Sequence, residues 1–301
     1  MAAFTTFESS ALERYLVMFG KGELSGYEAI SGGIENSNYF VTLLQDGQPT
    51  EYVLTIIENL SFNDVPFFNK LVSRLQHYGL PVAAPETTLD GMSSTIFCGK
   101  PAFLVRRLAG RHPRDVNAGQ CEQIGIYIAQ SHAAAADLDA SRDNPYSPAW
   151  MRDTIAQIGS LSPEQRNQLM QSVQAYERIL AMSLPVGLIH GDLFRDNTLF
   201  LDDGQLSGVI DFYHACQDLL IQDLAVVLND WCADASQSIN RALSDALISG
   251  YESVRPLSDE EKKALPELQQ ITACRFALTR FTSGSPPLKD PYEMLALAER
   301  L

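Results

Sequence analysis

Paired cysteines, net positive charge and long apolar runs are all missing from this sequence of 301 residues. Its five cysteines are scattered and odd in number, and none stands in a Cys-x-x-Cys pair. This argues against a disulfide framework and against a zinc site. No apolar run approaches the ~18–20 residues that span a bilayer, and the first residues lack the basic start and apolar core of a signal peptide. We therefore expect a cytoplasmic protein with reduced thiols.

Basic residues are outnumbered by acidic ones, with 22 Lys and Arg against 37 Asp and Glu and a net charge of −15. This balance argues against binding nucleic acid or an anionic membrane through a broad basic surface. The expected partners are small molecules, and an anionic ligand would have to be held by local groups. With 46% hydrophobic and 20% charged residues, the composition is that of an ordinary globular protein. The oligomeric state is left open.

The chain changes character near residue 107. Before this point, periodicity predicts helices over 11–19 and 65–78 and strands within 27–44, 51–57, 95–98 and 102–108. After it, helical spacing predicts helices near 116–138, 163–182, 223–233, 238–252 and 266–281. We therefore predict an α+β fold with two domains. Residues 1–107 form an antiparallel sheet with a helix, and residues 108–301 form a larger, mainly helical domain.

The strongest chemical signal is the stretch Leu188-Ile-His-Gly-Asp-Leu-Phe-Arg-Asp-Asn197, followed by Gly208-Val-Ile-Asp-Phe212. Asp192 and Asn197 have the spacing of His-x-Asp-Leu-x-x-x-Asn, in a loop between two short strands. A hairpin then returns Asp211 beside Asn197. Phosphoryl transfer needs a carboxylate that accepts the proton of the attacking hydroxyl, and oxygen ligands for Mg²⁺. We predict that Asp192 is the catalytic base and that Asn197 and Asp211 are metal ligands.

Each of these residue types is also common in ordinary turns. Their joint order and spacing, each beside an apolar strand, argue against coincidence. His190 is counted with the catalytic group, and its expected role is to support the loop by a hydrogen bond to the backbone near Asp211. A proton shuttle is less favoured for His190, because Asp192 already fills the position of the base.

A glycine-containing turn in the first domain is the candidate phosphate-covering loop. The segment Ser31-Gly32-Gly33 would let backbone amides approach phosphate oxygens, and Ser37 or Asn38 would donate further hydrogen bonds. An ordinary hairpin turn is the alternative. Arg106 stands in the strand that leads to the interdomain linker and is a further candidate for nucleotide binding, although such arginines more often face solvent or form ion pairs.

The motif residues resemble those of the aminoglycoside phosphotransferase/choline kinase group of small-molecule kinases. These kinases have a glycine after the motif histidine, where protein kinases have an arginine, and this chain has Gly191 at that position. Within this group the chain is most similar to the homoserine kinases of this fold. The matching segments are Gly33–Phe40, Tyr52–Ile56, His190–Phe194, Ile210–Asp218, Asp223–Ala225 and Leu228–Cys232. The resemblance covers about residues 27 to 281. It implies a bilobal protein-kinase-like fold and transfer of the ATP γ-phosphate, with Mg²⁺, to the side-chain hydroxyl of L-homoserine, a step of threonine biosynthesis.

Two positions depart from the wider kinase pattern. The third strand has Thr55 where kinases usually have a lysine for the α- and β-phosphates. The homoserine kinases of this group resemble the chain in having threonine here, so Thr55 stays among the expected nucleotide-binding residues. The compensating cation is left open, with Lys70 one candidate and Mg²⁺ with backbone amides another. Arg195 stands where relatives often have proline.

A zwitterionic amino acid needs an acceptor for its ammonium group and a donor for its carboxylate. The residues expected to bind such a substrate are Tyr213, Asp218, Asn229, Trp231 and Arg275, with Arg275 for the carboxylate. Packing or ion pairing is an alternative explanation for each. Two other functions also stay open: a kinase of the same fold acting on choline, an aminoglycoside, a sugar or a protein hydroxyl, and a pseudokinase that binds nucleotide without transferring phosphate. The sequence does not separate ATP from GTP.

Overall fold

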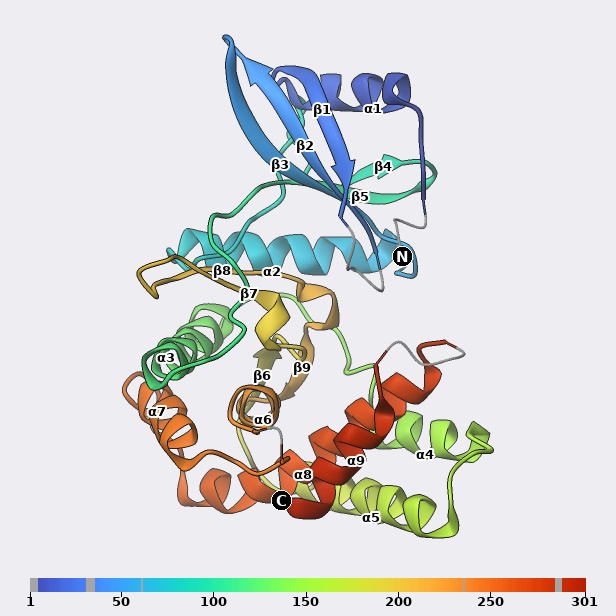
Figure 1. Cartoon of the computed structure of the whole chain (residues 1–301), viewed down its shortest axis with the longest axis vertical. Coiled ribbons are helices and arrows are strands. Elements are labelled where there is room, and N and C mark those ends of the chain that lie inside the picture. Colours follow the sequence, from blue (N-terminus) through green and yellow to red (C-terminus); the bar gives the residue numbers. More distant parts are fainter. Residues whose placement is uncertain (1–4, 31–35, 61, 235, 285–288) are drawn as a thin grey trace. The chain divides into compact units, whose positions relative to one another are not determined.

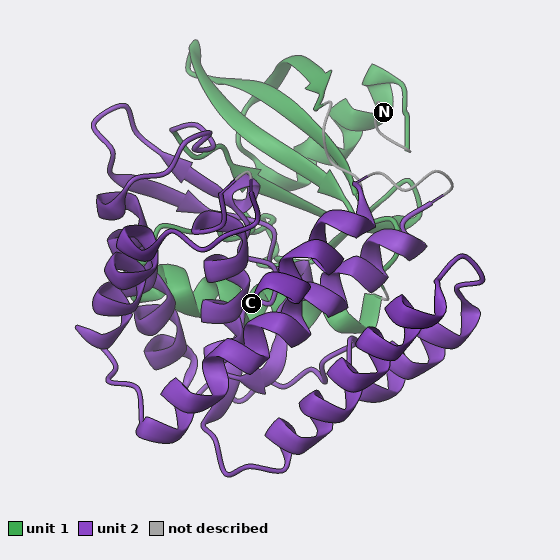
Figure 2. Ribbon diagram, turned by 60° about the horizontal axis from the view of Figure 1, so that its bottom comes forward, with its two compact units in different colours: residues 1–109 green, residues 110–301 purple. Residues whose placement is uncertain are grey.

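The chain divides into two units, residues 1–109 and residues 110–301 (Figure 2). The computed structural model describes residues 5–30, 36–60, 62–234, 236–284 and 289–301. Unit 1 is built around a β-sheet and unit 2 is mainly helical (Figure 1). The predicted α+β class is therefore confirmed.

Unit 1 contains an antiparallel sheet with the strand order β1-β2-β3-β5-β4. The strands are β1 (Glu23–Ala29), β2 (Ser37–Gln45), β3 (Gln48–Ile56), β4 (Thr95–Phe97) and β5 (Lys100–Arg106). Asp46 and Gly47 join β2 to β3, with φ values of 51° and 75°. Positive φ at both positions is what a two-residue hairpin turn requires, and Asp-Gly adopts it readily.

Side-chain alternation decides which face of this sheet is buried. Tyr39, Val41 and Leu43 of β2 lie on one face with Leu54 and Ile56 of β3, and all five belong to the core of unit 1. Residues one position along these strands point to the opposite face. The helices of unit 1 are α1 (Ser9–Leu16), which contributes to the same core, and α2 (Val65–His77), with 3₁₀ turns η1 (Val17–Phe19) and η2 (Phe62–Asp64).

Unit 2 places two short β-pairs among helices. Its helices are α3 (Ala118–Ala135), α4 (Pro148–Gln157), α5 (Pro163–Leu180), α6 (Ile221–Trp231), α7 (Arg241–Glu252), α8 (Asp259–Thr282) and α9 (Pro291–Arg300). Its strands are β6 (Val186–Ile189), β7 (Thr198–Phe200), β8 (Leu206–Val209) and β9 (Cys216–Leu219), with 3₁₀ turns η3 (Arg195–Asn197) and η4 (Phe212–His214). Strand β6 pairs with β9 and β7 with β8, both antiparallel. Helix α6 packs against α3, α7 and α8, and every residue from Ile221 to Asn229 is buried (Figure 1).

Helices α3 and α7 pack with their backbones in contact. A Cβ atom at Gly125 would lie 2.1 Å from Leu247 O, and one at Gly250 would lie 2.2 Å from Glu122 O. Glycine at both positions therefore allows an approach that any side chain would prevent. This approach brings Tyr251 of α7 to the buried side of α3.

The expected start of one helix was wrong, and two helices were not predicted. Helix α8 begins at Asp259 rather than at Pro266, because Ser258 and Glu261 form a capping box ahead of it. Pro266 then lies inside the helix. Helices α4 and α9 had no predicted counterpart.

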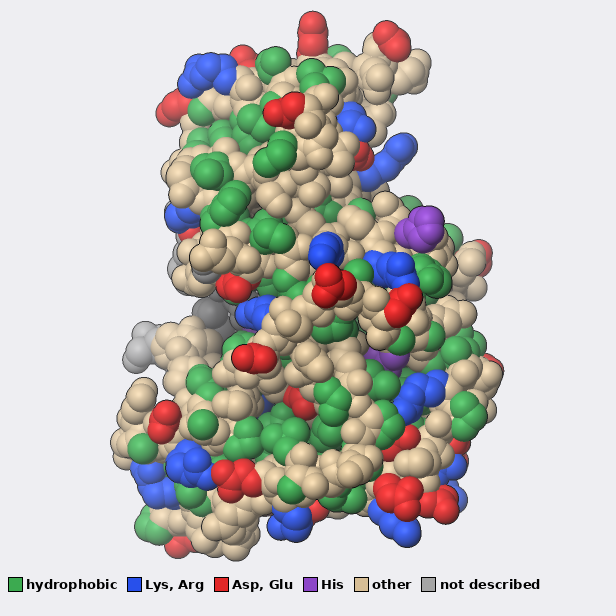
Figure 3. Space-filling model, turned by 180° about the vertical axis from the view of Figure 1, so that it is seen from behind, with side chains coloured by type: hydrophobic (Ala, Val, Ile, Leu, Met, Phe, Trp, Pro, Cys, Tyr) green, Lys and Arg blue, Asp and Glu red, His purple; other side chains and the backbone are tan. Residues whose placement is uncertain are grey.

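Acidic and basic side chains are interspersed on the face shown in Figure 3. Because the two signs are mixed, this face has no broad basic field. The net charge of the whole chain is −15. Among the described residues, no helix is both long enough and apolar enough to cross a membrane.

Candidate active site

The motif residues lie on one loop of unit 2 and on the hairpin that follows it. Strand β6 ends at Ile189 and β7 begins at Thr198, so the loop between them carries His190 to Asn197. The β7–β8 hairpin then returns the chain, and Ile210 N donates a hydrogen bond of 3.0 Å to Asn197 O. Asp211 follows with a left-handed backbone, φ 64° and ψ 62°. The hairpin thus brings Asp211 beside Asn197.

Asp192 and Asn197 are directly bonded. Asn197 Nδ2 donates to Asp192 O at 2.7 Å and to Asp192 Oδ2 at 3.0 Å. Because both N–H groups of this carboxamide point to Asp192, its Oδ1 is directed elsewhere. The amide oxygen of Asn197 and the carboxylate of Asp211 are hard oxygen donors, which is the chemistry that Mg²⁺ prefers when substrate phosphates supply further ligands. These residues therefore fit a nucleotide-bound magnesium ion.

A buried carboxylate on α6 holds the start of the loop. Asp223 accepts hydrogen bonds from His190 N at 2.9 Å and from Gly191 N at 2.8 Å. His132 Nε2 lies 3.1 Å from Asp223 Oδ2, and His132 Nδ1 lies 3.1 Å from the hydroxyl of Tyr251. Burial by itself would raise the pKa of Asp223, but the hydrogen bond from His132 and the one from the Gly191 amide hold that pKa below its usual value. Asp223 is therefore a positioning residue for the loop.

His190 links the two sides of the motif. Its Nε2 lies 3.0 Å from Ile210 O, and its Nδ1 accepts a bond of 3.3 Å from Asp192 N. A carbonyl on one side and an N–H on the other require a neutral ring with the proton on Nε2. Burial also lowers the pKa of His190, which favours the same neutral form. This geometry matches the loop-supporting role expected of His190.

Gly191 cannot carry a side chain without disturbance. Its φ is +77°, and a Cβ atom there would lie 2.9 Å from His214 O. We expect Gly191→Ala to lower the free energy of unfolding by about 1–3 kcal/mol, since it adds left-handed strain and a backbone clash, and to lower kcat/KM because Asp192 follows directly. Urea unfolding and steady-state kinetics test this.

The matched control is Gly204→Ala in the β7–β8 turn. Gly204 has φ +85°, but nothing lies within 4 Å of its Cβ position. This variant shares the backbone cost without the clash, so we expect about 1 kcal/mol of destabilisation and unchanged kinetics. Equal effects of the two substitutions on kcat/KM would contradict the positioning argument for Gly191.

Arg275 of α8 is the buried cation beside the loop. It is 5% exposed, and its Nη2 donates to Gly191 O at 2.8 Å. Its guanidinium carbon lies 4.9 Å from the centre of the Tyr146 ring and 3.4 Å from that of Phe276. Burial lowers the pKa of Arg275, and the charge of Asp192 opposes that shift. Arg275, predicted from the sequence as a substrate residue, is thus placed next to the predicted base.

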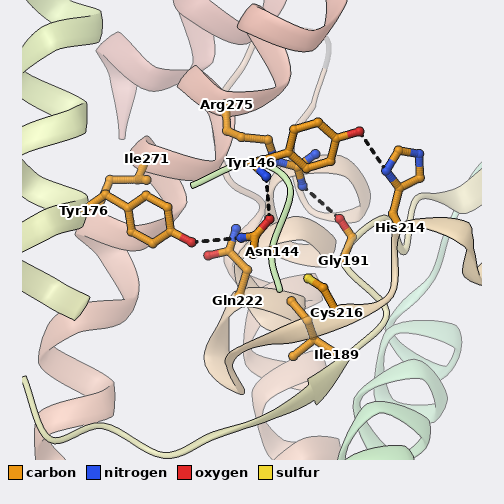
Figure 4. Close-up of a pocket in the computed structure, with 10 residues that line it drawn as sticks. All are labelled: Asn144, Tyr146, Tyr176, Ile189, Gly191, His214, Cys216, Gln222, Ile271 and Arg275. Carbon is orange, nitrogen blue, oxygen red and sulfur yellow. Dashed lines mark hydrogen bonds between the residues drawn. The ribbon is translucent and has the colours of Figure 1, made fainter. Parts of the chain in front are cut away.

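A small pocket lies beside Gly191 and Arg275 (Figure 4). It lies within unit 2, and its polar lining residues are Asn144, Tyr146, Tyr176, His214, Gln222 and Arg275. Apart from Arg275, none of these was among the predicted site residues. They come from separate parts of the chain and carry no local motif.

Asp218 lies behind this pocket rather than on its wall. Tyr176 donates to Asp218 Oδ2 at 2.6 Å, Asn144 Nδ2 donates to the same oxygen, and Leu219 N donates to Oδ1 at 2.7 Å. Burial raises the pKa of Asp218, and these donors oppose that rise. The carboxylate therefore fixes two side chains that line the pocket.

Two other predicted substrate residues are bonded to the protein itself. Trp231 is 1% exposed, and its Nε1 donates to Leu193 O at 3.2 Å. Asn229 donates to Gln269 O at 2.8 Å and accepts from Gln269 Nε2 at 3.2 Å. Trp231 thus holds the loop that carries His190 to Asn197, and Asn229 joins α6 to α8.

The predicted nucleotide residues of unit 1 do not all meet. Thr55 Oγ1 donates to Asn38 Oδ1 at 2.7 Å, so these two share a face of the sheet. Ser37 is fully buried; its hydroxyl donates to Glu58 Oε1 at 2.5 Å and accepts from Thr5 N at 2.9 Å. Ser37 therefore points into unit 1, away from Asn38 and Thr55.

Arg106 also lies away from Thr55. In the β3–β5 pairing, Thr55 stands opposite Phe103 and Tyr52 opposite Arg106. Since Tyr52 belongs to the core face, alternation places Arg106 on that face and Thr55 on the other. The predicted Ser31-Gly32-Gly33 segment lies outside the described residues.

A model of the family described as "Phosphotransferase enzyme family" matches residues 26–257. The homoserine kinase of Neisseria meningitidis serogroup B is 39% identical to this chain, over 97% of the chain and 96% of that protein. The homoserine kinase of Pseudomonas aeruginosa (strain UCBPP-PA14) is 37% identical, over 100% of the chain and 96% of that protein.

Solved structures share the fold at low identity. An amicoumacin kinase in complex with AMP-PNP superposes with a TM-score of 0.77 at 15% identity, covering 98% of this chain and 92% of that one. A microcompartment-associated aminopropanol kinase gives a TM-score of 0.72 at 17% identity, covering 97% of both chains. At these identities the likeness shows the fold alone, and that fold is the protein-kinase-like one predicted.

Proposed function

This chain belongs to the phosphotransferase enzyme family, and on that premise we propose that it is a homoserine kinase. It transfers the γ-phosphate of ATP to the side-chain hydroxyl of L-homoserine and forms O-phospho-L-homoserine, the reaction of threonine biosynthesis expected from the sequence. The observation that carries this function is the 37–39% identity to homoserine kinases over nearly the whole length of both proteins. The enzyme acts on a hydroxyl group, as predicted.

Asp192 is the proposed base. Its carboxylate accepts the proton of the attacking hydroxyl as the bond to phosphorus forms. The bond from Asn197 Nδ2 fixes the orientation of Asp192 Oδ2, and Asp223 fixes the loop behind it through two backbone amides. His190, held neutral, joins the loop to the backbone next to Asp211 through its bond to Ile210 O rather than moving a proton.

Asn197 Oδ1 and the Asp211 carboxylate are the proposed Mg²⁺ ligands. When bound, the ion would neutralise charge on the transferring phosphate. On the chain's side, the hairpin bond between Ile210 N and Asn197 O keeps the two ligand residues adjacent.

In unit 1, Asn38 and Thr55 are the described residues that we propose for nucleotide contact. Their mutual hydrogen bond orients both on one face of the sheet. Ser37 is better explained by support of unit 1, because it is buried against Glu58. Arg106 is exposed and stands on the face of the sheet opposite to Thr55, so we do not propose that it joins Thr55 in nucleotide contact. ATP as the donor also supports the predicted cytoplasmic location, where ATP is abundant.

For the amino-acid substrate, we propose that Arg275 binds the carboxylate. Tyr213 follows Asp211 on η4 and stays a predicted substrate contact. Asp218 acts indirectly, through Asn144 and Tyr176. Trp231 and Asn229 are proposed as positioning residues, given their bonds within unit 2.

A screen for ADP release tests the function. Purified protein with Mg–ATP would be offered amino acids, amino alcohols including choline, sugars and an aminoglycoside, and we expect L-homoserine to give the highest kcat/KM by at least about tenfold. Turnover of choline but not of L-homoserine would assign the protein to another substrate. Binding of Mg–ATP with no turnover on any acceptor would instead support the pseudokinase alternative that Thr55 raises.

A further inference from the structure

The pocket beside the catalytic loop contains a buried hydrogen-bond acceptor that the protein does not satisfy. Gln222 of α6 lines this pocket (Figure 4) and is only 5% exposed. Within the described part of the chain, Gln222 Oε1 has no hydrogen-bond partner. Buried polar atoms are nearly always bonded, to protein or to an ordered water, so an unsatisfied oxygen on the wall of a pocket is free to accept a hydrogen bond from a donor that enters it.

The orientation of this amide is fixed from behind. Gln222 Nε2 lies 3.0 Å from Thr272 Oγ1, and Thr272 Oγ1 lies 2.7 Å from Leu268 O. A threonine hydroxyl has one hydrogen, which here is used on the carbonyl of Leu268, so towards Gln222 it can only accept. The amide must therefore turn its NH₂ group to Thr272, and this leaves Oε1 for the pocket.

A cationic donor lines the same pocket. Arg275 has five N–H groups, and among the described residues one hydrogen bond from it is seen, to Gly191 O. The ring contacts with Tyr146 and Phe276 hold the guanidinium in place. The nearby carboxylate of Asp218 is already engaged by Tyr176 and Asn144. Beside its other polar residues, the pocket thus offers one positive donor, Arg275, and one unsatisfied neutral acceptor, Gln222 Oε1.

We propose that Gln222 determines the selectivity of this enzyme for an α-amino acid. Its Oε1 accepts a hydrogen bond from the ammonium group of the substrate while Arg275 binds the carboxylate. A zwitterion suits this pair, because it adds no net charge to a buried site and satisfies both groups. A neutral amide also cannot form an ion pair with Arg275, which a carboxylate at position 222 would do. This inference rests on the proposed homoserine kinase function and adds the residue that binds the ammonium group.

The test compares L-homoserine with two analogues that each lack one charged group. 4-Hydroxybutanoate lacks the ammonium group, and 3-aminopropan-1-ol lacks the carboxylate. We expect Gln222→Met, which keeps the length of the side chain and removes the acceptor, to lower the preference for L-homoserine over 4-hydroxybutanoate by about 10- to 100-fold in kcat/KM. The change should appear mainly in KM. The preference for L-homoserine over 3-aminopropan-1-ol should stay unchanged, because both carry the ammonium group.

Two further variants keep the outcome interpretable. Thr272→Val removes the group that orients the amide, so we expect a smaller loss of the same preference. Tyr127→Phe removes a hydroxyl that, like Gln222 Oε1, is buried and has no partner among the described residues. Tyr127 does not line the pocket, so this variant should keep both preferences of the wild type. An unchanged preference in Gln222→Met, with L-homoserine still phosphorylated, would overturn the role of Gln222 alone. A wild-type enzyme that does not phosphorylate L-homoserine would overturn the proposed function itself.

Discussion

Asp192→Asn should lower kcat by ~10²-fold or more while leaving the fold nearly intact. In the wild type, Asn197 Nδ2 donates a hydrogen bond of 3.0 Å to Asp192 Oδ2. The substitution preserves the shape of the side chain and leaves one oxygen that can accept this bond. What it removes is the ability to take the proton of the attacking hydroxyl. The loop keeps its supports, because the bonds from His190 N and Gly191 N to Asp223 do not involve the changed group. ADP release with saturating L-homoserine and ATP measures kcat, and thermal unfolding checks the fold.

Asp196→Asn is the matched control, because it makes the same change four positions along the same loop. Asp196 is exposed and its Oδ2 lies 3.1 Å from Lys289 Nζ. Such surface pairs contribute little, so kcat should stay within about twofold of the wild type. Full activity in Asp192→Asn, or an equal loss in both variants, would contradict the assignment of Asp192 as the base.

The loop that carries His190 to Asn197 could be predicted from the sequence because local rules determine its form. The spacing of Asp192 and Asn197 and the hairpin that follows are short-range features, and the structure joins both ends by hydrogen bonds. The fold class was predictable for a similar reason, since hydrophobic periodicity changes near residue 107. From the sequence we expected one helix to start at Pro266. The capping signal of Ser258 is stronger, and the helix begins directly after it.

The pocket could not be predicted, because its walls come from distant segments. Asn144 and Tyr176 are linked to Asp218 across 74 and 42 positions of the chain. No local pattern encodes such contacts. Gln222 had one usable signal, a polar residue at the start of a mostly apolar helix, and its unsatisfied oxygen became visible only in the structure.

Closeness to the motif in the sequence does not determine where the other side chains point. Trp231 and Asn229 follow Asp211 soon in sequence, but all of α6 except Asp230 is buried, so these two side chains bond to neighbouring elements. Arg106 illustrates the same limit in a sheet. Which face it takes depends on the pairing of β5 with β3, and a shift of one residue would reverse the face.

Asp223 anchors the loop that carries Asp192, and it is 1% exposed. Three donors converge on its carboxylate: His190 N at 2.9 Å, Gly191 N at 2.8 Å and His132 Nε2 at 3.1 Å. An asparagine at this position offers one oxygen and must point an N–H group at one of these donors. Removing one partner from a buried charged network leaves the others unsatisfied and typically costs about 3–5 kcal/mol.

We therefore expect Asp223→Asn to lower the free energy of unfolding by about 3 kcal/mol and to reduce kcat, because the loop that carries Asp192 loses its anchor. Denaturant unfolding at pH 7 measures the first effect. The pKa of Asp223 is lowered in the folded protein, so its stabilising contribution is complete above about pH 4 and is lost as the pH falls through the lowered pKa. The difference between wild type and variant should shrink over that acidic range. Asp245→Asn, in an exposed pair with Arg241, should change neither quantity. A difference between wild type and Asp223→Asn that does not depend on pH would show that the buried charge is not what holds the loop.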